Sequence, residues 1–192
     1  MLYNVTKAIK KMNNLKLIVC SDKNGIIGIN NSLPWTNLAD LKHFKTTTLN
    51  HYVIMGFNTF KYLPSKLQNR KLIILSSNKN KVIAFNNANF KYNDLIIFSS
   101  INECLSFVYK NDDGFFIAGG ETIYNLFLPY VKTIIHTLID IEIKNDLTNI
   151  FYKFINTEKE NFILSSIKIL DEKTKVFYYD RITYENFDFT LF

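Results

Sequence analysis

Short apolar segments alternate with polar ones along most of the chain. Apolar segments bounded by Asn, Asp, Ser or Gly are typical of buried strands. These segments are 15–21, 52–56, 71–77, 95–98 and 114–118. The intervening residues favour helices over 38–50, 57–63, 101–110 and 121–128. Strands that alternate with helices predict a mostly parallel sheet of the α/β class.

The C-terminal part of the chain has a different pattern. A long apolar segment covers 131–141, and two further ones, 162–170 and 175–184, surround the turn 171–174. This arrangement predicts a long strand followed by an antiparallel hairpin at the sheet edge. The segments expected to form loops are 26–31, 78–94 (with or without a short edge strand at 82–85) and 147–160.

The chain contains no internal repeat and no linker, so we expect one domain over 15–192. Residues 1–14 precede the first strand and include Lys7, Lys10 and Lys11 but no acidic residue. They are interpreted as an N-terminal extension. A targeting segment is the alternative, although the stretch has no Arg and no long apolar core.

Capping residues indicate where several helices begin. Asn37 can accept a hydrogen bond from a free amide of the next helix, and Ser100 with Glu103 forms a capping-box pattern. Asn58 or Thr59 can cap the short helix after 52–56, leaving free amides that suit a phosphate.

The pair Gly119-Gly120 lies between a strand and a helix. That arrangement is typical of phosphate or dinucleotide binding, but a tight turn needs the same residues. Both interpretations stay open.

Composition narrows the classes of function. The net charge is +6, but the lysines are spread along the chain without a nucleic-acid motif, so an anionic small ligand explains the balance equally well. No apolar run is long enough for a membrane span. Cys20 and Cys104 lie in apolar segments, which indicates core thiols in a reducing, cytoplasmic compartment. His43, His51 and His136 are scattered, and no metal site is predicted.

Asp40 is the anomaly within the helix that begins at Leu38. It adjoins Leu41 and precedes Phe44 by one turn, so a carboxylate borders an apolar face. It can be a first-turn acid that faces water and favours the positive end of the helix dipole. Alternatively, an apolar pocket holds it to handle protons and raises its pKa.

Several separated blocks occur in the order and at the spacing of one enzyme family. They are Ile26-Ile27-Gly28, Leu33-Pro34-Trp35, Asp40-Leu41 with Phe44-Lys45, Val53-Ile54-Met55-Gly56 with Thr59, Arg70, Ile73-Ile74-Leu75-Ser76-Ser77, Ala118-Gly119-Gly120 with Ile123-Tyr124, and Thr137 with Asp140. Over 15–184 the chain therefore resembles dihydrofolate reductase.

The resemblance implies a central eight-stranded, mostly parallel sheet with flanking helices and a C-terminal antiparallel hairpin. It also implies reduction of 7,8-dihydrofolate to 5,6,7,8-tetrahydrofolate, with hydride passing from NADPH to pterin C6. Such an enzyme would supply one-carbon and thymidylate metabolism, bind antifolate inhibitors and act as a monomer, with no nucleic-acid or membrane partner.

The implied substrate site centres on Asp40. This carboxylate would hydrogen-bond the pterin 2-amino group and N3 and assist proton delivery to N5 through a water. Arg70 would clamp the α-carboxylate of the glutamate. The implied catalytic residues are Asp40, Leu33, Trp35 and Thr137. The implied substrate-binding residues are Ile18, Cys20, Asp40, Leu41, Phe44, Leu63, Arg70, Ala118, Tyr124 and Thr137.

The implied cofactor site includes a mobile loop with Ile27, Gly28 and Leu33 that closes over the nicotinamide. The family joins the glycine pair by a cis peptide, and amides at two helix starts would meet the pyrophosphate. The other implied cofactor-binding residues are Cys20, Gly56, Phe57, Asn58, Thr59, Leu75, Ser76, Ser77, Ala118, Gly119, Gly120, Glu121, Thr122, Ile123 and Tyr124.

Three features depart from the family pattern. Phe57 stands where the family usually has an Arg that holds the adenosine 2′-phosphate, which makes tolerance of NADH an open alternative. The remaining candidates for that anion are Asn58, Ser76, Ser77 and Lys79. Ala118 replaces a larger aliphatic residue and predicts extra room for inhibitors. Residues 147–151 depart from the usual Thr-aromatic-Phe-Pro pattern.

Two other functions are alternatives to this one. The pterin- and pyrimidine-reducing relatives from riboflavin synthesis would share the glycine pair, but they would not need Asp40 with Leu41, Phe44 and Arg70. A nucleotide- or folate-binding domain without turnover, or a basic RNA-binding module, would be favoured by a missing pocket carboxylate, and Asp40 is present.

Overall fold

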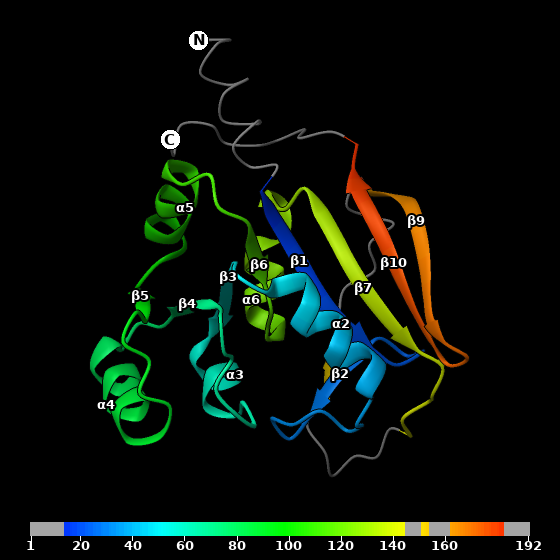
Figure 1. Cartoon of the computed structure of the whole chain (residues 1–192), viewed down its shortest axis with the longest axis horizontal. Coiled ribbons are helices and arrows are strands. Elements are labelled where there is room, and N and C mark those ends of the chain that lie inside the picture. Colours follow the sequence, from blue (N-terminus) through cyan, green and yellow to red (C-terminus); the bar gives the residue numbers. More distant parts are fainter. Residues whose placement is uncertain (1–13, 145–150, 154–161, 183–192) are drawn as a thin grey trace.

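The computed structural model describes residues 14–144, 151–153 and 162–182. The main strands are β1 (Leu15–Ser21), β3 (Tyr52–Gly56), β4 (Lys71–Leu75), β5 (Ile96–Phe98), β6 (Phe115–Ile117), β7 (Thr133–Ile139), β9 (Phe162–Asp171) and β10 (Thr174–Arg181). They form one eight-stranded sheet in the order β5-β4-β3-β6-β1-β7-β10-β9 (Figure 1). Neighbours from β5 to β7 are parallel, and β10 is antiparallel to β7 and β9. This confirms the predicted fold class.

Helices cover both faces of the sheet. They are α2 (Leu38–Thr48), α3 (Phe57–Lys61), α4 (Lys79–Asn89), α5 (Ile101–Lys110) and α6 (Glu121–Phe127), which continues into the short 3₁₀ helix η1 (Leu128–Tyr130). Side chains alternate between the faces along β3: Ile54 packs with residues of α5 and α6, whereas Val53 and Met55 pack with Phe60 of α3 and Val82 of α4. The result is a three-layer α/β domain.

Strand β1 lies in the middle of the sheet, between β6 and β7. Leu17 and Val19 point to the α5 and α6 face, and Ile18 points to the opposite face. There Ile18 packs with Ile135 of β7 and with Phe44 of α2. Helix α2 therefore covers the face of β1 and β7 that carries Ile18.

Three loop predictions were wrong in part, because the segments 26–31, 78–94 and 147–160 each contain a strand or a helix. Residues 26–29 form strand β2 (Ile26–Ile29), which pairs antiparallel with β8 (Phe151–Lys153) in a small second sheet. The predicted loop with an edge strand at 82–85 is instead helix α4, capped by the side chain of Asn78. The extension 1–14, apart from Asn14, and the rest of the 147–160 segment lie outside the described residues.

The capping predictions had mixed outcomes. Asn37 Oδ1 accepts a hydrogen bond from Asp40 N at 2.8 Å, and Ser100 Oγ accepts one from Glu103 N at 3.3 Å. Both N-caps are confirmed. The cap of α3 was wrong, because this helix begins at Phe57 with Gly56 as its N-cap and no side-chain hydrogen bond.

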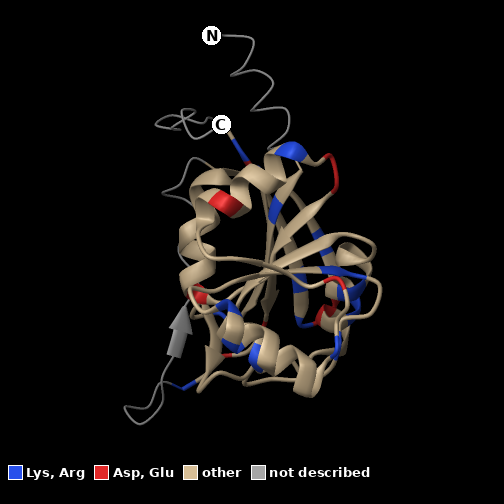
Figure 2. Ribbon diagram, turned by 90° about the vertical axis from the view of Figure 1, so that its left-hand side faces the viewer, with Lys and Arg blue, Asp and Glu red and all other residues tan. Residues whose placement is uncertain are grey.

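Basic and acidic residues are distributed over many elements of the domain, as Figure 2 shows, so the net charge of +6 is not gathered on one helix. In the part of the chain that the structure describes, no helix has both the length and the apolar character that crossing a bilayer requires.

Candidate active site

Helix α2 places Asp40 over the ends of β1 and β7. Phe44, one turn further along α2, packs against Ile18 of β1 and Ile135 of β7. The Asp40 side chain is half-buried. The helix does not bury its leucines: Leu38 is 77% and Leu41 is 45% exposed, whereas His43 and Thr48 are buried. The exposed leucines leave an apolar rim beside the carboxylate.

The surroundings of Asp40 favour its protonated form. Burial raises the pKa of the Asp40 carboxyl, and the hydroxyl of Thr137 and the thiol of Cys20 offset the shift in part. Cys20 of β1 and Thr137 of β7 are register partners, so they project side by side from the same face of the sheet. The apolar-pocket interpretation of Asp40 fits this environment better than a solvent-facing first-turn acid.

A few buried polar atoms of the described residues have no hydrogen-bond partner. They are Trp35 Nε1, His43 Nε2, Thr137 Oγ1, and Nε and Nη1 of Arg70. An unsatisfied buried group costs about 1–3 kcal/mol, so such atoms mark places where a ligand or water completes the hydrogen bonds. Trp35, Thr137 and Arg70 are all residues that the sequence predicted to face the substrate.

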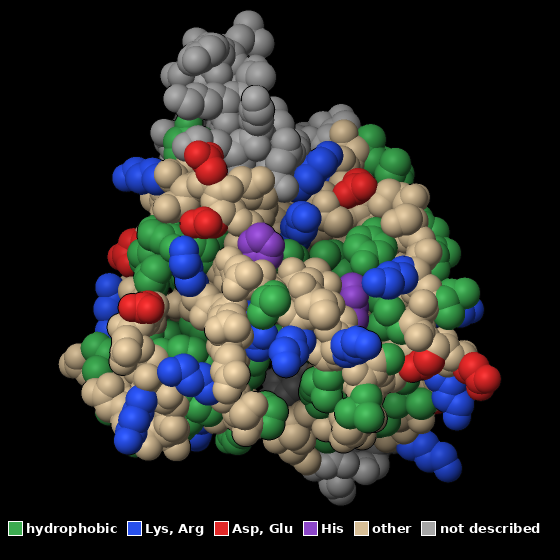
Figure 3. Space-filling view, viewed as in Figure 1, with side chains coloured by type: hydrophobic (Ala, Val, Ile, Leu, Met, Phe, Trp, Pro, Cys, Tyr) green, Lys and Arg blue, Asp and Glu red, His purple; other side chains and the backbone are tan. Residues whose placement is uncertain are grey.

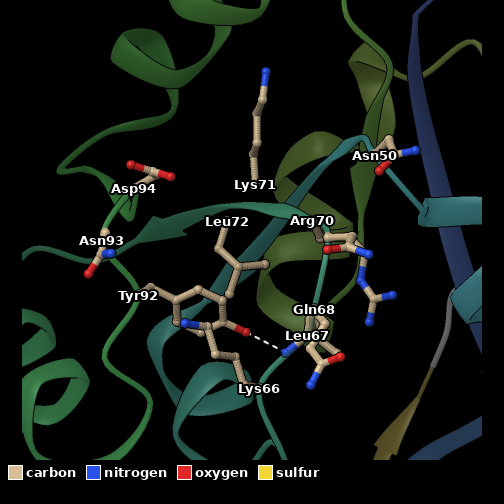
Figure 4. A pocket seen from close by; sticks show the side chains of 11 residues that line it. Asn50, Lys66, Leu67, Gln68, Arg70, Lys71, Leu72, Tyr92, Asn93 and Asp94 are labelled. Carbon is tan, nitrogen blue, oxygen red and sulfur yellow. Dashed lines mark hydrogen bonds between the residues drawn. The ribbon is translucent and has the colours of Figure 1, made fainter.

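Arg70 borders a hollow of about 410 Å³ at the start of β4. The hollow is also lined by Lys66, Leu67 and Tyr92, and Figure 4 shows the guanidinium of Arg70 extending away from Tyr92 and Asp94. Burial lowers the Arg70 pKa from its very high usual value. Figure 3 shows this side of the molecule, where Lys and Arg side chains are scattered among apolar and acidic ones.

The junctions β3–α3 and β6–α6 lie against each other. Gly56 N donates a hydrogen bond to Gly119 O at 2.9 Å, and the peptide Gly119–Gly120 is cis, as the resemblance implied. Gly119 has φ +112°, and a Cβ on Gly120 would lie 3.3 Å from Thr59 Oγ1. A Cβ on Gly56 would lie 3.0 Å from Ile123 Cγ1. The glycines therefore form a cradle of backbone atoms that any side chain would fill.

Tyr124 connects this cradle to β1. It is buried, and its hydroxyl donates a hydrogen bond to Ile18 O at 2.9 Å. Burial, followed by the nearby Cys20 and Asp40, raises the pKa of the Tyr124 hydroxyl, so it stays neutral. Ala118, half-buried at the end of β6, packs in the same cluster as Ile18.

The candidate nicotinamide loop carries Ile27, Gly28 and Leu33. The Asp22 carboxylate holds its N-terminal end in place by hydrogen bonds. Asp22 Oδ1 accepts hydrogen bonds from Ile26 N and Asn24 N, and Oδ2 accepts one from Ile143 N. Strand β2 carries Ile27, half-buried, and the buried Gly28. Residues 30–33, which follow β2, are exposed, and Leu33 is 52% exposed. Of the three implied loop residues, Leu33 is the one that the structure leaves away from the core.

The chain is similar to known enzymes over most of its length. The sequence profile of the family described as "Dihydrofolate reductase" matches residues 14–186. The chain belongs to the dihydrofolate reductase family. Dihydrofolate reductase of Staphylococcus haemolyticus is 33% identical over 168 residues, which cover 88% of this chain and 93% of the relative. That of Ureaplasma parvum is 36% identical over 165 residues, covering 83% and 99%.

The fold is also that of the family. A solved structure, "Dihydrofolate reductase from Enterococcus faecalis complexed with NADP(H)and RAB-propyl", has a TM-score of 0.73 with 24% identity and covers 90% of this chain and 98% of that one. At this identity the comparison shows a shared fold.

Phe57, at the start of α3, is one of the residues that the resemblance implied for the cofactor site. It packs edge-on against Phe85 of α4 with ring centroids 5.9 Å apart, and Lys81 Nζ lies 5.8 Å from the Phe57 ring. Lys79 instead pairs with Glu103 at 3.9 Å. An aromatic ring with a lysine beside it therefore occupies the position at which the resemblance led us to expect an arginine. The other implied residues nearby are Leu75 and Ser76, half-buried, and Asn58, Ser77 and Thr122, exposed, with Glu121 half-buried at the start of α6.

Sequence reasoning missed Tyr92. Its hydroxyl accepts a hydrogen bond from Leu67 N and helps to line the hollow at Arg70. Leu63 and Phe44, which were predicted, pack with it in the cluster beside α3. No local signal marks Tyr92, because only the tertiary fold brings it beside a segment so much earlier in the chain.

Proposed function

We propose that the chain catalyses the NADPH-dependent reduction of 7,8-dihydrofolate to 5,6,7,8-tetrahydrofolate, which supplies one-carbon and thymidylate metabolism. One observation carries this proposal in a member of this family: the half-buried Asp40 carboxylate interacts with the Thr137 hydroxyl and the Cys20 thiol, and the buried Trp35 Nε1 has no hydrogen-bond partner among the described residues. Such a set matches the polar edge of a pterin, which combines amino and N–H donors with a carbonyl acceptor.

Asp40 accepts hydrogen bonds from the pterin 2-amino group and N3 and so orients the ring. Its raised pKa, caused by burial, places its proton exchange nearer the working range of the enzyme. Because Asp40 holds the edge of the pterin away from N5, a water carries the proton to N5, and the carboxylate favours the protonated form of the substrate.

Arg70 binds the glutamate α-carboxylate of the substrate. Its Nε and Nη1 atoms have no partner among the described residues, and a guanidinium can meet a carboxylate through two parallel hydrogen bonds. Leu41, Phe44 and Leu63 contact the rings between pterin and glutamate. Antifolates that share the pterin edge bind the same pocket, with extra room at Ala118.

NADPH supplies the hydride that reaches pterin C6. The cradle of Gly56, Thr59, Gly119 and Gly120 fits its pyrophosphate, since the backbone is not shielded by side chains there. Closure of the loop carrying Ile27, Gly28 and Leu33 excludes water from the reacting atoms. The aromatic ring of Phe57 gives the 2′-phosphate no bidentate partner, so the enzyme also accepts NADH.

The experiment follows the loss of reduced nicotinamide absorbance on addition of dihydrofolate, with NADPH and then with NADH. Asp40→Asn is expected to reduce the rate by at least about 100-fold at neutral pH, the usual size of an acid–base contribution, and much less at acid pH, where solvent protonates the substrate. Asp113→Asn, an exposed aspartate of the loop before β6, is the matched control. No dihydrofolate-dependent oxidation by the wild-type chain would refute the proposal.

A further inference from the structure

One continuous part of the sequence supplies the whole positive charge of the chain. Residues 41–93 contain no Asp or Glu, whereas the rest of the chain has 14 basic and 17 acidic residues. The basic residues of this segment are Lys42, Lys45, Lys61, Lys66, Arg70, Lys71, Lys79, Lys81 and Lys91. The segment therefore carries a charge of +9, and the remaining residues together are negative.

The fold places this segment on one side of the sheet. Helix α3, helix α4 and most of α2 belong to it. Phe60 of α3 and Val82 of α4 are buried in one cluster, against which Phe44 of α2 packs. The opposite face is covered by α5 and α6, which carry Glu103 and Glu121 in their first turns. The uneven charge of the sequence thus becomes a difference between the two helix layers.

Most of these basic side chains are exposed and have no acidic partner. Among the described residues, Lys71 Nζ lies 3.8 Å from Asp113 Oδ2, and Lys79 Nζ lies 3.9 Å from Glu103 Oε2. The lysines of α2 and α3 form no ion pair with another described residue. Uncompensated charges of one sign attract anions from solution, over about 10 Å at 0.1 M salt and about 30 Å at 0.01 M.

The positive side of the molecule contains the hollow at Arg70 (Figure 4). Its lining includes Lys66, Arg70 and Lys71 and a single acidic residue, Asp94. A concave site with protein walls concentrates the field of such charges. The buried Nε and Nη1 atoms of Arg70 have no hydrogen-bond partner among the described residues. An anion attracted to this side therefore finds unused donors within the hollow.

We propose that the basic residues of 41–93 form an electrostatic steering surface, which attracts the glutamate end of dihydrofolate, with its two carboxylates, toward Arg70 before contact. This inference rests on the proposed function, because it concerns that substrate. Asp40 lies at the pterin end of the site, so the opposite charges of the two ends also orient the approaching molecule. Lys42 and Lys61 act through their charge without touching the bound substrate, and they raise the association rate constant while leaving the dissociation rate constant unchanged.

The test measures association of dihydrofolate by stopped-flow fluorescence, without cofactor. Trp35 is the single tryptophan of the chain and lies in the candidate site, so its fluorescence reports binding. The double variant Lys42→Gln/Lys61→Gln removes two exposed charges. At about 0.01 M salt its association rate constant is expected to be about fivefold below that of the wild type, and the difference is expected to vanish near 1 M salt, where charges are screened within about 3 Å.

The matched control is Lys110→Gln/Lys175→Gln, which removes two exposed charges from α5 and β10, outside the segment. It is expected to change the association rate constant by less than about twofold. A second probe is an antifolate without carboxylates, whose association with the wild type and with Lys42→Gln/Lys61→Gln is expected to be equal.

Equal decreases in the two double variants would overturn the inference, as would association of dihydrofolate that does not slow with salt. A decrease for the antifolate without carboxylates as large as that for dihydrofolate would also overturn it, because the substitutions would then act on the site and not through charge. Absence of dihydrofolate-dependent turnover in the wild type would refute the proposed function instead.

Discussion

At the scale of single residues, a substitution of Phe57 tests whether this position sets the preference for NADPH over NADH. Phe57→Arg is expected to raise the ratio of kcat/KM for NADPH to that for NADH by about tenfold, since a new guanidinium can pair with the 2′-phosphate that only NADPH carries. Steady-state kinetics with each cofactor measure the ratio. Phe57→Leu, which removes the ring without adding charge, is the control. If Phe57→Arg and Phe57→Leu gave the same ratio, the phosphate would be bound elsewhere.

Single residues also separate what the sequence can and cannot predict. Asp40 was noticeable in the sequence because it borders the apolar residues Leu41 and Phe44 at helical spacing. The family resemblance then assigned this carboxylate to a predicted pterin-binding site. The sequence did not reveal that α2 buries His43 and Thr48 while Leu38 stays exposed. Which polar side chain is buried depends on what β9 and β10 place against the helix, and that is tertiary information.

At the scale of elements, α4 shows how a short apolar run can mislead. Residues 82–85 look like an edge strand, but Val82 and Asn86 lie one turn apart and are both buried. The helix forms because Asn78 caps it and because Phe85 packs against Phe60 and Phe90. Periodicity over so few residues does not distinguish a strand from a helix, so packing decides.

Asn86 ties α4 to the loop that carries Tyr92. Its Nδ2 donates to Tyr92 O and its Oδ1 accepts from Tyr92 N, both at 3.0 Å. Asn86→Ala is expected to lower the free energy of unfolding by about 1–3 kcal/mol, because the Tyr92 backbone groups lose their partners. Urea denaturation gives the value. Asn87→Ala, on the exposed side of α4, is expected to change it by less than about 0.5 kcal/mol, and equal losses would contradict this assignment.

At the scale of the whole molecule, His136 makes folding sensitive to acid. Burial lowers its pKa from 6.5 to about 4, and its Nε2 lies 2.7 Å from Ser21 Oγ. The native state therefore stays unprotonated while the unfolded chain binds a proton. Stability is present above the unfolded pKa and is lost as the pH falls from about 6.5 to about 4.

Over that interval the free energy of unfolding is expected to fall by about 3 kcal/mol because of His136. His136→Gln, which can still bond to Ser21 but does not titrate, is expected to flatten the dependence. Denaturant titrations at several pH values between these limits measure both slopes. Parallel slopes for the two proteins would assign the acid sensitivity to other groups.

The fold class and the hairpin could be predicted from the sequence, because predicted strands and helices alternate as far as 131–141 and only strands follow. The strand order could not be predicted, because no local feature of residues 15–21 indicates that they pair with 115–117 and 133–139. The family resemblance supplied the eight-stranded arrangement. The small sheet of β2 and β8 escaped because each strand is very short.

The central place of β1 has a consequence for biosynthesis. Leu15 pairs with Phe115 and Cys20 with Thr137, so β1 leaves the ribosome about a hundred residues before the strands that flank it in the sheet. Until those strands are made, the apolar residues on both faces of β1 lack their native neighbours. Pairings that distant make folding slow and leave the growing chain prone to association, so β1 depends on protection while translation proceeds.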